Sequence, residues 1–345
     1  GTPDHGDDGP IPVRRAHEIV GATASFIESA VHGGYAWIDD LNGGASDTLP
    51  TGIGLVPSNI VDGVRTGAGA AFLVPAGGRP NLAVLSGTRA LQVMFDGARA
   101  TGVRVLGPGG AQVLTADRIV LSAGAIGSAH LLMLSGIGDE AMLRAVGVPV
   151  VVAAPVGLRT ADHPEWVLPT DWPVAASRPV LEVVLSLAEG IEIRPYTGGF
   201  IAMVGDGSTG HPDWPHIGVA LMNPRARGRV ELVSADPAVP PAIAHHYDAE
   251  PADLAVLEQG TAVARELASA ATHIGEAQWS TSQHLCGTAP MGADDDDGAV
   301  LDPTCRVRGV DGLWVIDGSI MPSIPSRGPH ATTIALAHRA AEFVR

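Results

Sequence analysis

The sequence predicts a mixed α/β and α+β protein with a parallel-type strand and helix unit in one part and an antiparallel sheet in another. Short β-prone runs between 81 and 121 are separated by glycine turns, and the last run leads through a small-residue turn into a helical pattern at 125–136. Strand-like runs then dominate 165–251, and a long helical pattern follows from 252 to about 270. The tail places a buried-type strand at 313–316 before a helix from about 331.

The elements before residue 81 follow from local patterns. Residues 16–34 space Ile19, Ala22, Phe26 and Ala30 at helical intervals and end at a Gly-Gly pair, which predicts one surface helix. Residues 38–80 are punctuated by Gly, Asp, Asn and Pro, which predicts loops that need support from other elements.

Composition restricts the class of protein. The chain has 345 residues, 46% apolar and 17% charged, which is enough for two domains with a sizeable core. A net charge of −16 without a basic run argues against a nucleic-acid partner. No apolar run approaches the roughly 18 residues of a membrane span. Two cysteines, Cys286 and Cys305, form no disulfide framework or metal motif and say little about the redox compartment. Since the sequence shows neither a membrane span nor the pattern of a secretory signal, we expect a soluble, cytoplasmic protein without an integral membrane segment.

Two of the thirteen histidines stand out as candidate catalytic residues. His284 precedes a glycine-rich "GTAPMG" stretch, and His330 follows a Gly-Pro loop immediately before a predicted helix. Such a position suits a catalytic imidazole, but it equally suits a polar ring that satisfies backbone groups, and spacing alone leaves both alternatives open.

Other chemistries fit the sequence poorly. A serine hydrolase would need a G-x-S-x-G elbow, and "DGSIM" lacks the second glycine. The adjacent pair His245 and His246 lacks the spacing of a helical zinc site, so no metal is expected there. The acidic run 294–297 is most simply a solvated loop, with weak Ca²⁺ binding as the alternative.

The stretch "GAIGSAHLLMLSGIG" (124–138) resembles the second signature of the glucose-methanol-choline (GMC) flavoprotein oxidoreductases, apart from Ala129, where the pattern has Pro or Ser. The resemblance continues in order through "NIVDGVRTGAGAAFLVPAGGRPNL", "GRVELVSADPAVPP", "QHLCGTAPMG" and "GLWVIDGSIMPSIPS". It departs at "GLRTADH" (157–163), where Arg159 and Thr160 replace Asn and Leu. The variant "STSQHLCGTAPMG" is also similar to the mycofactocin-associated branch.

The resemblance implies an incomplete FAD-binding Rossmann-like domain joined to an antiparallel-sheet substrate domain. It assigns 1–164 to the partial FAD-binding domain, 165–283 to the substrate-binding domain and 284–345 to a return to the FAD-binding domain. Members of the family begin with a strand, a G-x-G-x-x-G turn and a helix that hold the FAD pyrophosphate, and this motif is absent here. We therefore expect a family protein without its first segment.

The resemblance also implies roles for particular residues in a choline dehydrogenase-like flavoprotein. His284 matches the catalytic base, which removes the hydroxyl proton of a small-molecule alcohol while hydride leaves for flavin N5, and His330 matches the second residue of that pair. The electron acceptor stays open. The implied FAD-binding residues, with plain strand or turn structure as the alternative for each, are Ala90, Asp317, Gly318, Ala331, Thr332 and Thr333.

Two rival functions stay open at the level of sequence. A hydroxynitrile lyase of the same fold would bind FAD without using it in redox chemistry, with the same histidines in acid–base roles. A non-catalytic fragment, unable to retain FAD without the pyrophosphate-binding turn, would serve at most in binding or assembly.

Overall fold

The computed structural model describes residues 5–43, 50–173, 178–199 and 214–344. It separates into two compact units, each formed by three segments of the chain. Unit 1 comprises Gly1–Val84, Pro164–Met222 and Ala252–Thr281. Unit 2 comprises Leu85–His163, Asn223–Pro251 and Ser282–Arg345. The predicted fold class is confirmed, because parallel strand pairs and antiparallel sheets occur together with helices.

Unit 1 is built on a seven-stranded sheet in the order β1-β2-β12-β13-β14-β11-β17. Its strands are β1 (Trp37–Ile38), β2 (Gly52–Leu55), β11 (Pro164–Pro169), β12 (Val183–Leu187), β13 (Ile191–Tyr196), β14 (His216–Leu221) and β17 (Gln278–Thr281). The first pair is parallel and every other pair is antiparallel. The predicted antiparallel strands at 191–196 and 216–221 are therefore confirmed, with Ile191 opposite Leu221 and Tyr196 opposite His216.

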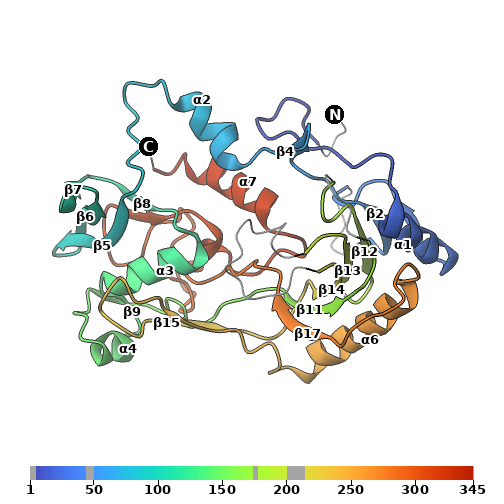
Figure 1. Cartoon of the computed structure of the whole chain (residues 1–345). Coiled ribbons are helices and arrows are strands. Elements are labelled where there is room, and N and C mark those ends of the chain that lie inside the picture. The colour runs from blue at the N-terminus through green and yellow to red at the C-terminus, as the bar shows by residue number, and fades with distance from the viewer. Residues whose placement is uncertain (1–4, 44–49, 174–177, 200–213, 345) are drawn as a thin grey trace. The chain divides into compact units, whose positions relative to one another are not determined.

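Two helices pack on this sheet and complete one hydrophobic core. They are α1 (Gly21–His32), which ends before Gly33 as predicted, and α6 (Pro251–Leu267). Phe26 of α1 and Leu257 of α6 are almost fully buried in the same cluster as Leu185, Ile193 and other sheet residues. Figure 1 shows both helices beside the sheet. Burying such side chains stabilises the unit by about 1.5–3 kcal/mol each.

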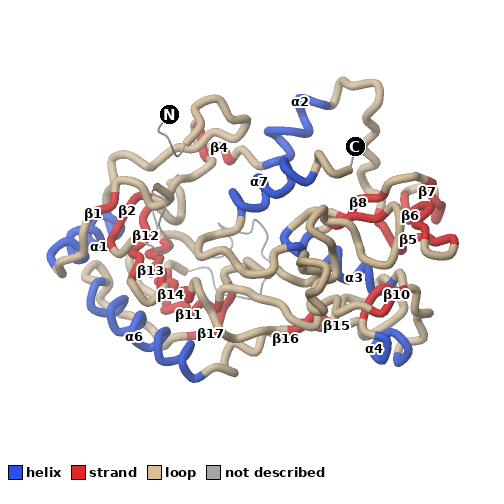
Figure 2. Tube along the Cα trace, turned by 180° about the vertical axis from the view of Figure 1, so that it is seen from behind, coloured by secondary structure: helices blue, strands red, loops and turns tan. Residues whose placement is uncertain are grey.

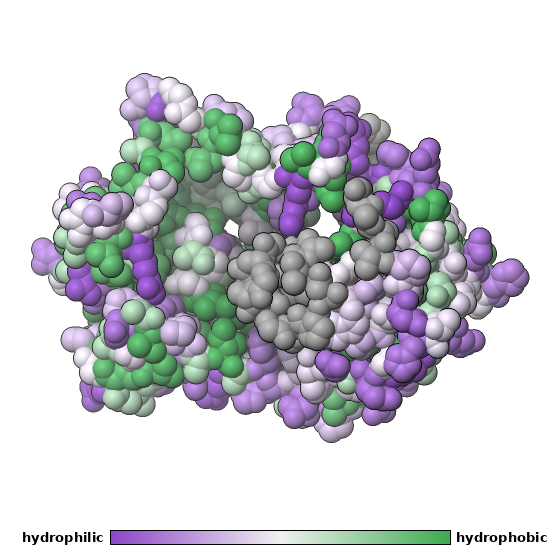
Figure 3. All heavy atoms as spheres, in the orientation of Figure 1, coloured by the Kyte–Doolittle hydropathy of each residue, from purple (hydrophilic) through white to green (hydrophobic). Residues whose placement is uncertain are grey.

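The segment that follows β2 buries little of its own apolar surface. It contains β3 (Ile60–Val61), β4 (Val64–Arg65), a π-helical turn η1 (Gly69–Leu73) and the short helix α2 (Val74–Ala76). No residue from 62 to 92 is buried within the described structure. Figure 3 shows apolar side chains gathered over α2, where Val74 is 74% exposed. This agrees with the prediction that the segment needs support from other elements.

One predicted strand is wrong. Residues 81–87, "NLAVLSG", form turns and irregular backbone instead of a strand. Leu82, Val84 and Leu85 are exposed, and no described strand pairs with this run. An apolar β-prone run becomes a strand only when a partner supplies the other half of its hydrogen-bond ladder.

Among its described residues, unit 2 contains four separate sheets, whose strands Figure 2 shows in red. The predicted meander is confirmed as an antiparallel sheet of β5 (Arg89–Asp96), β6 (Arg99–Gly107) and β7 (Gly110–Thr115). The parallel pairs are β8 (Ile119–Leu121) with β18 (Leu313–Val315) and β9 (Ile137–Gly138) with β10 (Val152–Ala153). An antiparallel pair joins β15 (Arg229–Glu231) to β16 (Ala242–Ala244).

The helices of unit 2 follow these strands. They are α3 (Gly124–Leu134), α4 (Glu140–Ala145), the 3₁₀ turn η3 (Gly318–Ile320) and α7 (His330–Ala340). Leu132 and Met133 of α3 are fully buried in a core shared with β8 and β18. The strand, turn and helix predicted at 117–136 is therefore present, and its helix N-terminus lies directly after β8.

Among the described residues, no helix combines the length and apolar character required to cross a membrane.

Candidate active site

The loop that carries His284 is fixed by backbone hydrogen bonds to the segment 161–163. Ala161 and Cys286 exchange two hydrogen bonds, at 3.1 and 2.9 Å, and the Ser282 N–H donates to the His163 carbonyl at 3.1 Å. The two segments therefore run side by side like short strands, although more than a hundred residues separate them. This pairing places the half-buried ring of His284 next to His163.

The two imidazoles form a directed hydrogen-bond pair. His163 is fully buried, and its Nε2 lies 2.9 Å from the carbonyl oxygen of Pro325. Because a carbonyl only accepts, that nitrogen carries the proton in neutral His163, and its Nδ1 is left as an acceptor. His284 Nδ1 lies 2.8 Å from it and must then donate. In the neutral pair this network leaves Nε2 of His284 without a proton.

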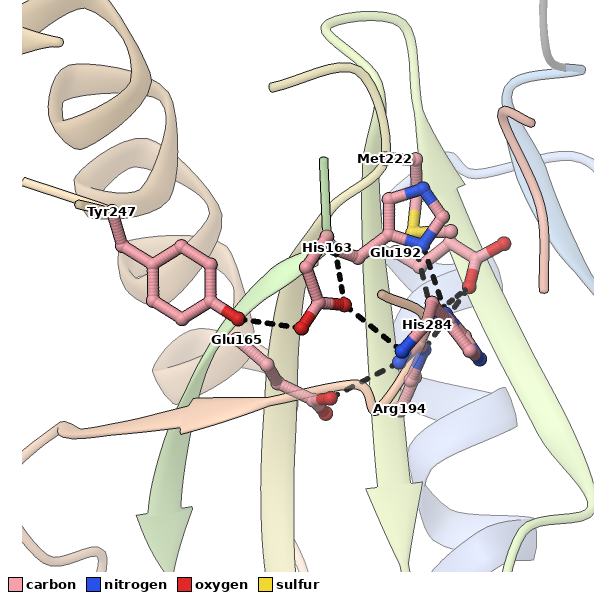
Figure 4. Close-up of polar contacts among 8 residues, drawn as sticks. His163, Glu165, Glu192, Arg194, Met222, Tyr247 and His284 are labelled. Carbon is pink, nitrogen blue, oxygen red and sulfur yellow. Dashed lines mark hydrogen bonds and ion pairs between the residues drawn. The ribbon is translucent and has the colours of Figure 1, made fainter. Parts of the chain in front are cut away.

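A buried carboxylate holds the backbone of both histidines. Asp162 Oδ1 accepts from the N–H of His163 at 2.8 Å and from the N–H of His284 at 2.9 Å, while Oδ2 accepts from the Tyr247 hydroxyl at 2.7 Å. Figure 4 shows the phenol of Tyr247 and the two histidines around these contacts. The ring of His245 stacks on Tyr247 with centroids 4.6 Å apart. Asp162 is therefore a positioning residue for the pair.

His330 follows Pro325, whose carbonyl contacts His163, by five residues, but the described structure records no contact between His330 and the histidine pair. It is the first residue of α7 and is exposed. Gly328, two residues earlier, packs against the His284 ring, since a Cβ added there would lie 3.5 Å from Nε2. The loop before α7 thus passes close to the nitrogen that the hydrogen-bond network leaves as an acceptor.

Asp317 joins β18 to the start of α3. Its Oδ2 accepts from the Gly124 N–H at 2.9 Å and from the Ser128 hydroxyl at 2.5 Å, and its Oδ1 accepts from the N–H and hydroxyl of Ser319. A strand, a small-residue turn and a helix N-terminus in succession favour an anion at the helix start, and here the Asp317 carboxylate is that anion. Gly318 beside it is half-buried, and a Cβ there would meet only one backbone oxygen, at 3.7 Å.

The remaining predicted cofactor residues lie on two other elements of unit 2. Ala331 and Thr332 are exposed in the first turn of α7, where N–H groups have no acceptor within the helix. The Thr333 N–H and hydroxyl both donate to the Pro329 carbonyl, at 2.8 and 2.9 Å. Ala90 is exposed on β5, an edge strand of its described sheet, where it pairs with Val105 of β6.

Family models match the chain over most of its length. The N-terminal model of the GMC oxidoreductases matches residues 7–165, and their C-terminal model matches residues 224–337. A GMC-type oxidoreductase from Rhodococcus erythropolis, described as uncharacterized and located in the thcA 5′ region, is 39% identical over 99% of this chain. The chain belongs to the GMC oxidoreductase family.

The chain spans only part of the length of its relatives. It spans 72% of the Rhodococcus protein and 66% of human mitochondrial choline dehydrogenase, to which it is 30% identical over 99% of its own length. The structure of pyridoxine 4-oxidase from Mesorbium loti superposes with a TM-score of 0.82 at 26% identity, covering 98% of this chain and 72% of that one. The assignment of this GMC protein to the mycofactocin-associated branch stays a prediction.

The residues present fit FAD, the cofactor that the GMC oxidoreductase family implies. The first turn of α7 offers backbone N–H donors, which suit the carbonyl oxygens along the edge of an isoalloxazine ring. The surface at Gly318 is open enough for a close approach of a ligand to the backbone. Both carboxylate oxygens of Asp317 accept hydrogen bonds from α3 and η3. We therefore expect Asp317 to act on the cofactor site by fixing the position of the start of α3.

Sequence reasoning missed three members of the site, namely Asp162, His163 and Tyr247. Asp162 and His163 could have been found from the motif at 157–163. Its middle residues depart from the family pattern, but its final Asp-His pair matches that pattern. Tyr247 had no motif around it, and only the folded structure brings its hydroxyl to the carboxylate. Among the described residues, no group of three or more His, Cys, Asp or Glu side chains could hold a metal ion.

Proposed function

We propose that this protein is an FAD-dependent GMC oxidoreductase that oxidises the CH–OH group of a small alcohol, with His284 as the general base. The observation that carries the proposal is the directed chain from Pro325 through His163 to His284, which leaves Nε2 of His284 as an acceptor. The flavin, when bound, supplies the acceptor for the hydride that leaves the alcohol carbon.

The hydrogen-bond chain also prepares His284 for the charge it gains. As Nε2 takes the hydroxyl proton, the ring becomes an imidazolium that still donates from Nδ1 to His163. A hydrogen bond from a charged donor is stronger than one from a neutral donor, so the interaction grows as the proton moves. The buried Asp162 carboxylate holds the backbone of both rings, so this geometry needs little reorganisation during the reaction.

His330 and the first turn of α7 act on the substrate oxygen in this proposal. The loop at Gly328 packs on His284, and His330 follows it at the start of the helix. An imidazole N–H there would donate to the alkoxide that forms as the proton leaves, and the partial positive charge of the helix start favours the same negative charge.

The experiment is anaerobic stopped-flow reduction of the FAD-loaded protein by two probe alcohols. Choline and pyridoxine are chosen because the relatives named above act on a choline or a pyridoxine hydroxyl group, as their names state. We expect His284→Ala to lower the rate of flavin reduction about 100-fold or more. His338→Ala is the matched control, since His338 is an exposed histidine on α7.

Retention of the visible flavin spectrum in both variants shows that the cofactor site is intact. A rate for His284→Ala within about threefold of the parent would refute the assignment of the base. Cleavage of a hydroxynitrile without any bleaching of the flavin by an alcohol would instead support the lyase alternative. Failure of the parent protein to retain added FAD would support the non-catalytic alternative.

A further inference from the structure

Unit 2 contains a cavity that the proposed chemistry does not use. It has a volume of about 220 Å³, and its walls come from 155–161, 287–298 and 321–323, together with Arg227. His163, His284 and His330 are not among its lining residues. The volume is that of several water molecules, so the cavity suits a small ligand and not a second dinucleotide.

The charges in this cavity differ from those of the whole molecule. The protein carries a net charge of −16, and all 21 of its basic residues are arginine. Two of these, Arg159 and Arg227, line the cavity, and Asp296 is the one acidic residue that its described lining contains. The Asp296 Oδ1 already accepts from the Gly298 N–H at 2.8 Å. The lining is therefore net positive within an acidic protein.

Both guanidinium groups keep donors available. Nη1 of Arg227 donates to the carbonyls of Pro224, Arg225 and Ala226 at 2.7, 3.1 and 2.9 Å, which fixes the orientation of the group. For Arg159, the described part of the chain supplies neither a hydrogen bond nor an ion pair to the side chain. A planar guanidinium matches two oxygens of a carboxylate or phosphate at once.

The backbone that carries Arg159 is held on both sides. Thr160 and Gly228 exchange two hydrogen bonds of 2.9 Å, and Ala161 and Cys286 exchange another two. The Gly157 N–H donates to the Thr288 carbonyl at 2.7 Å. A ligand therefore has to order the Arg159 side chain but not the loop, which reduces the entropic cost of binding. The family pattern has Asn at this position, so the guanidinium is a feature of this chain.

We propose that this cavity binds a small molecule through an oxyanion, either a carboxylate or a phosphate group, clamped between Arg159 and Arg227. The apolar walls of Leu158, Pro290 and Met321 contact the remainder of the ligand. This site is distinct from the histidine pair, and the proposal does not depend on the proposed oxidation.

The test is isothermal titration calorimetry with inorganic phosphate and with malonate as probes, at matched ionic strength and fixed FAD occupancy. We expect at least one probe to bind with a Kd of about 1 mM or tighter. Arg159→Gln should weaken that binding about tenfold or more. The matched control is Arg104→Gln, which makes the same charge change at an exposed position on β6 and should leave the Kd unchanged.

The two probes distinguish the sources of the oxyanion, because tighter binding of phosphate indicates a phosphate ester and tighter binding of malonate indicates a carboxylic acid. Arg159→Gln removes an exposed side chain, so its thermal midpoint should match that of the parent, which separates lost binding from unfolding. No saturable heat with either probe would overturn the proposal. Equal weakening by Arg159→Gln and Arg104→Gln would also overturn it, because general electrostatics would then explain the binding.

Discussion

Exchanging His163 for Asn or for Gln separates its two hydrogen bonds and tests the proposed role of the histidine pair. The Asn amide oxygen stands close to the position of Nδ1, so it can accept from Nδ1–H of His284 as the imidazole does. The Gln amide nitrogen stands close to the position of Nε2, so it can donate to Pro325 but leaves His284 without its acceptor. The structure places these two bonds at 2.8 and 2.9 Å on opposite sides of one buried ring.

The expected magnitude follows from the change in charge at His284. A hydrogen bond between neutral groups contributes about 1 kcal/mol, and one from a charged donor about 1.5–3 kcal/mol. The interaction with His163 therefore strengthens by roughly 0.5–2 kcal/mol as His284 gains a proton, which corresponds to a rate difference of about 2- to 30-fold. We expect His163→Gln to lose this factor and His163→Asn to retain most of it.

The assay is the anaerobic rate of flavin reduction by the better of the two probe alcohols, with thermal unfolding measured on each variant. Both exchanges disturb a buried position, so both should lower stability by about 1–3 kcal/mol, and a merely structural role for His163 would give similar rates in the two variants. A rate in His163→Gln equal to or above that in His163→Asn would refute the reasoning.

Three further predictions concern stability and reactivity. Burial raises the pKa of the Cys286 thiol to about 12 and that of Cys305 above its ordinary value, so iodoacetamide should alkylate neither at neutral pH until the chain unfolds, as mass spectrometry would show. Gly157→Ala should lower the free energy of unfolding, measured in urea, by about 1–3 kcal/mol more than Gly147→Ala does. Both glycines have positive φ, but only at Gly157 would the added Cβ lie 2.1 Å from a backbone oxygen. Burial lowers the pKa of His216 below 6.5, so the unfolded chain takes up a proton at higher pH than the folded one, and stability falls as the pH drops through 6.5. His216→Gln should reduce that loss, measured as the urea midpoint at neutral pH and at about pH 5.

Much of the fold could be predicted because the decisive patterns are local. The glycine-containing turns at 97–98 and 108–109 lie between strands that pair in the order of the sequence, so the meander of β5, β6 and β7 follows from spacing alone. The pairing of β11 with β17 and of β2 with β12 joins segments more than a hundred residues apart, and no local period encodes which strands meet. The failed strand at 81–87 has the same cause, since its composition is β-prone but its partner is not set by composition.

The candidate site likewise combines residues that local patterns mark with residues whose role depends on long-range contacts. His284 and His330 could be singled out as candidates because glycine-rich loops next to element ends, together with the family motif, mark positions where a backbone approaches a ligand, and their catalytic roles stay a prediction. His163 could not be given a role, because its importance lies in which nitrogen carries a proton. That is decided by the carbonyl of Pro325, 162 residues away along the chain.

The motif at 157–163 shows why a family pattern can change in one half and persist in the other. Asp162 and His163 face the His284 loop, where one carboxylate and one imidazole set the position and proton of a second imidazole. Arg159 lines the separate cavity, and Thr160 is held through its backbone by Gly228, a bond that any residue except proline can make. In this chain the last two residues of the motif therefore position the histidine pair, while Arg159 faces the separate cavity, where its guanidinium is chemically suited to an oxyanion.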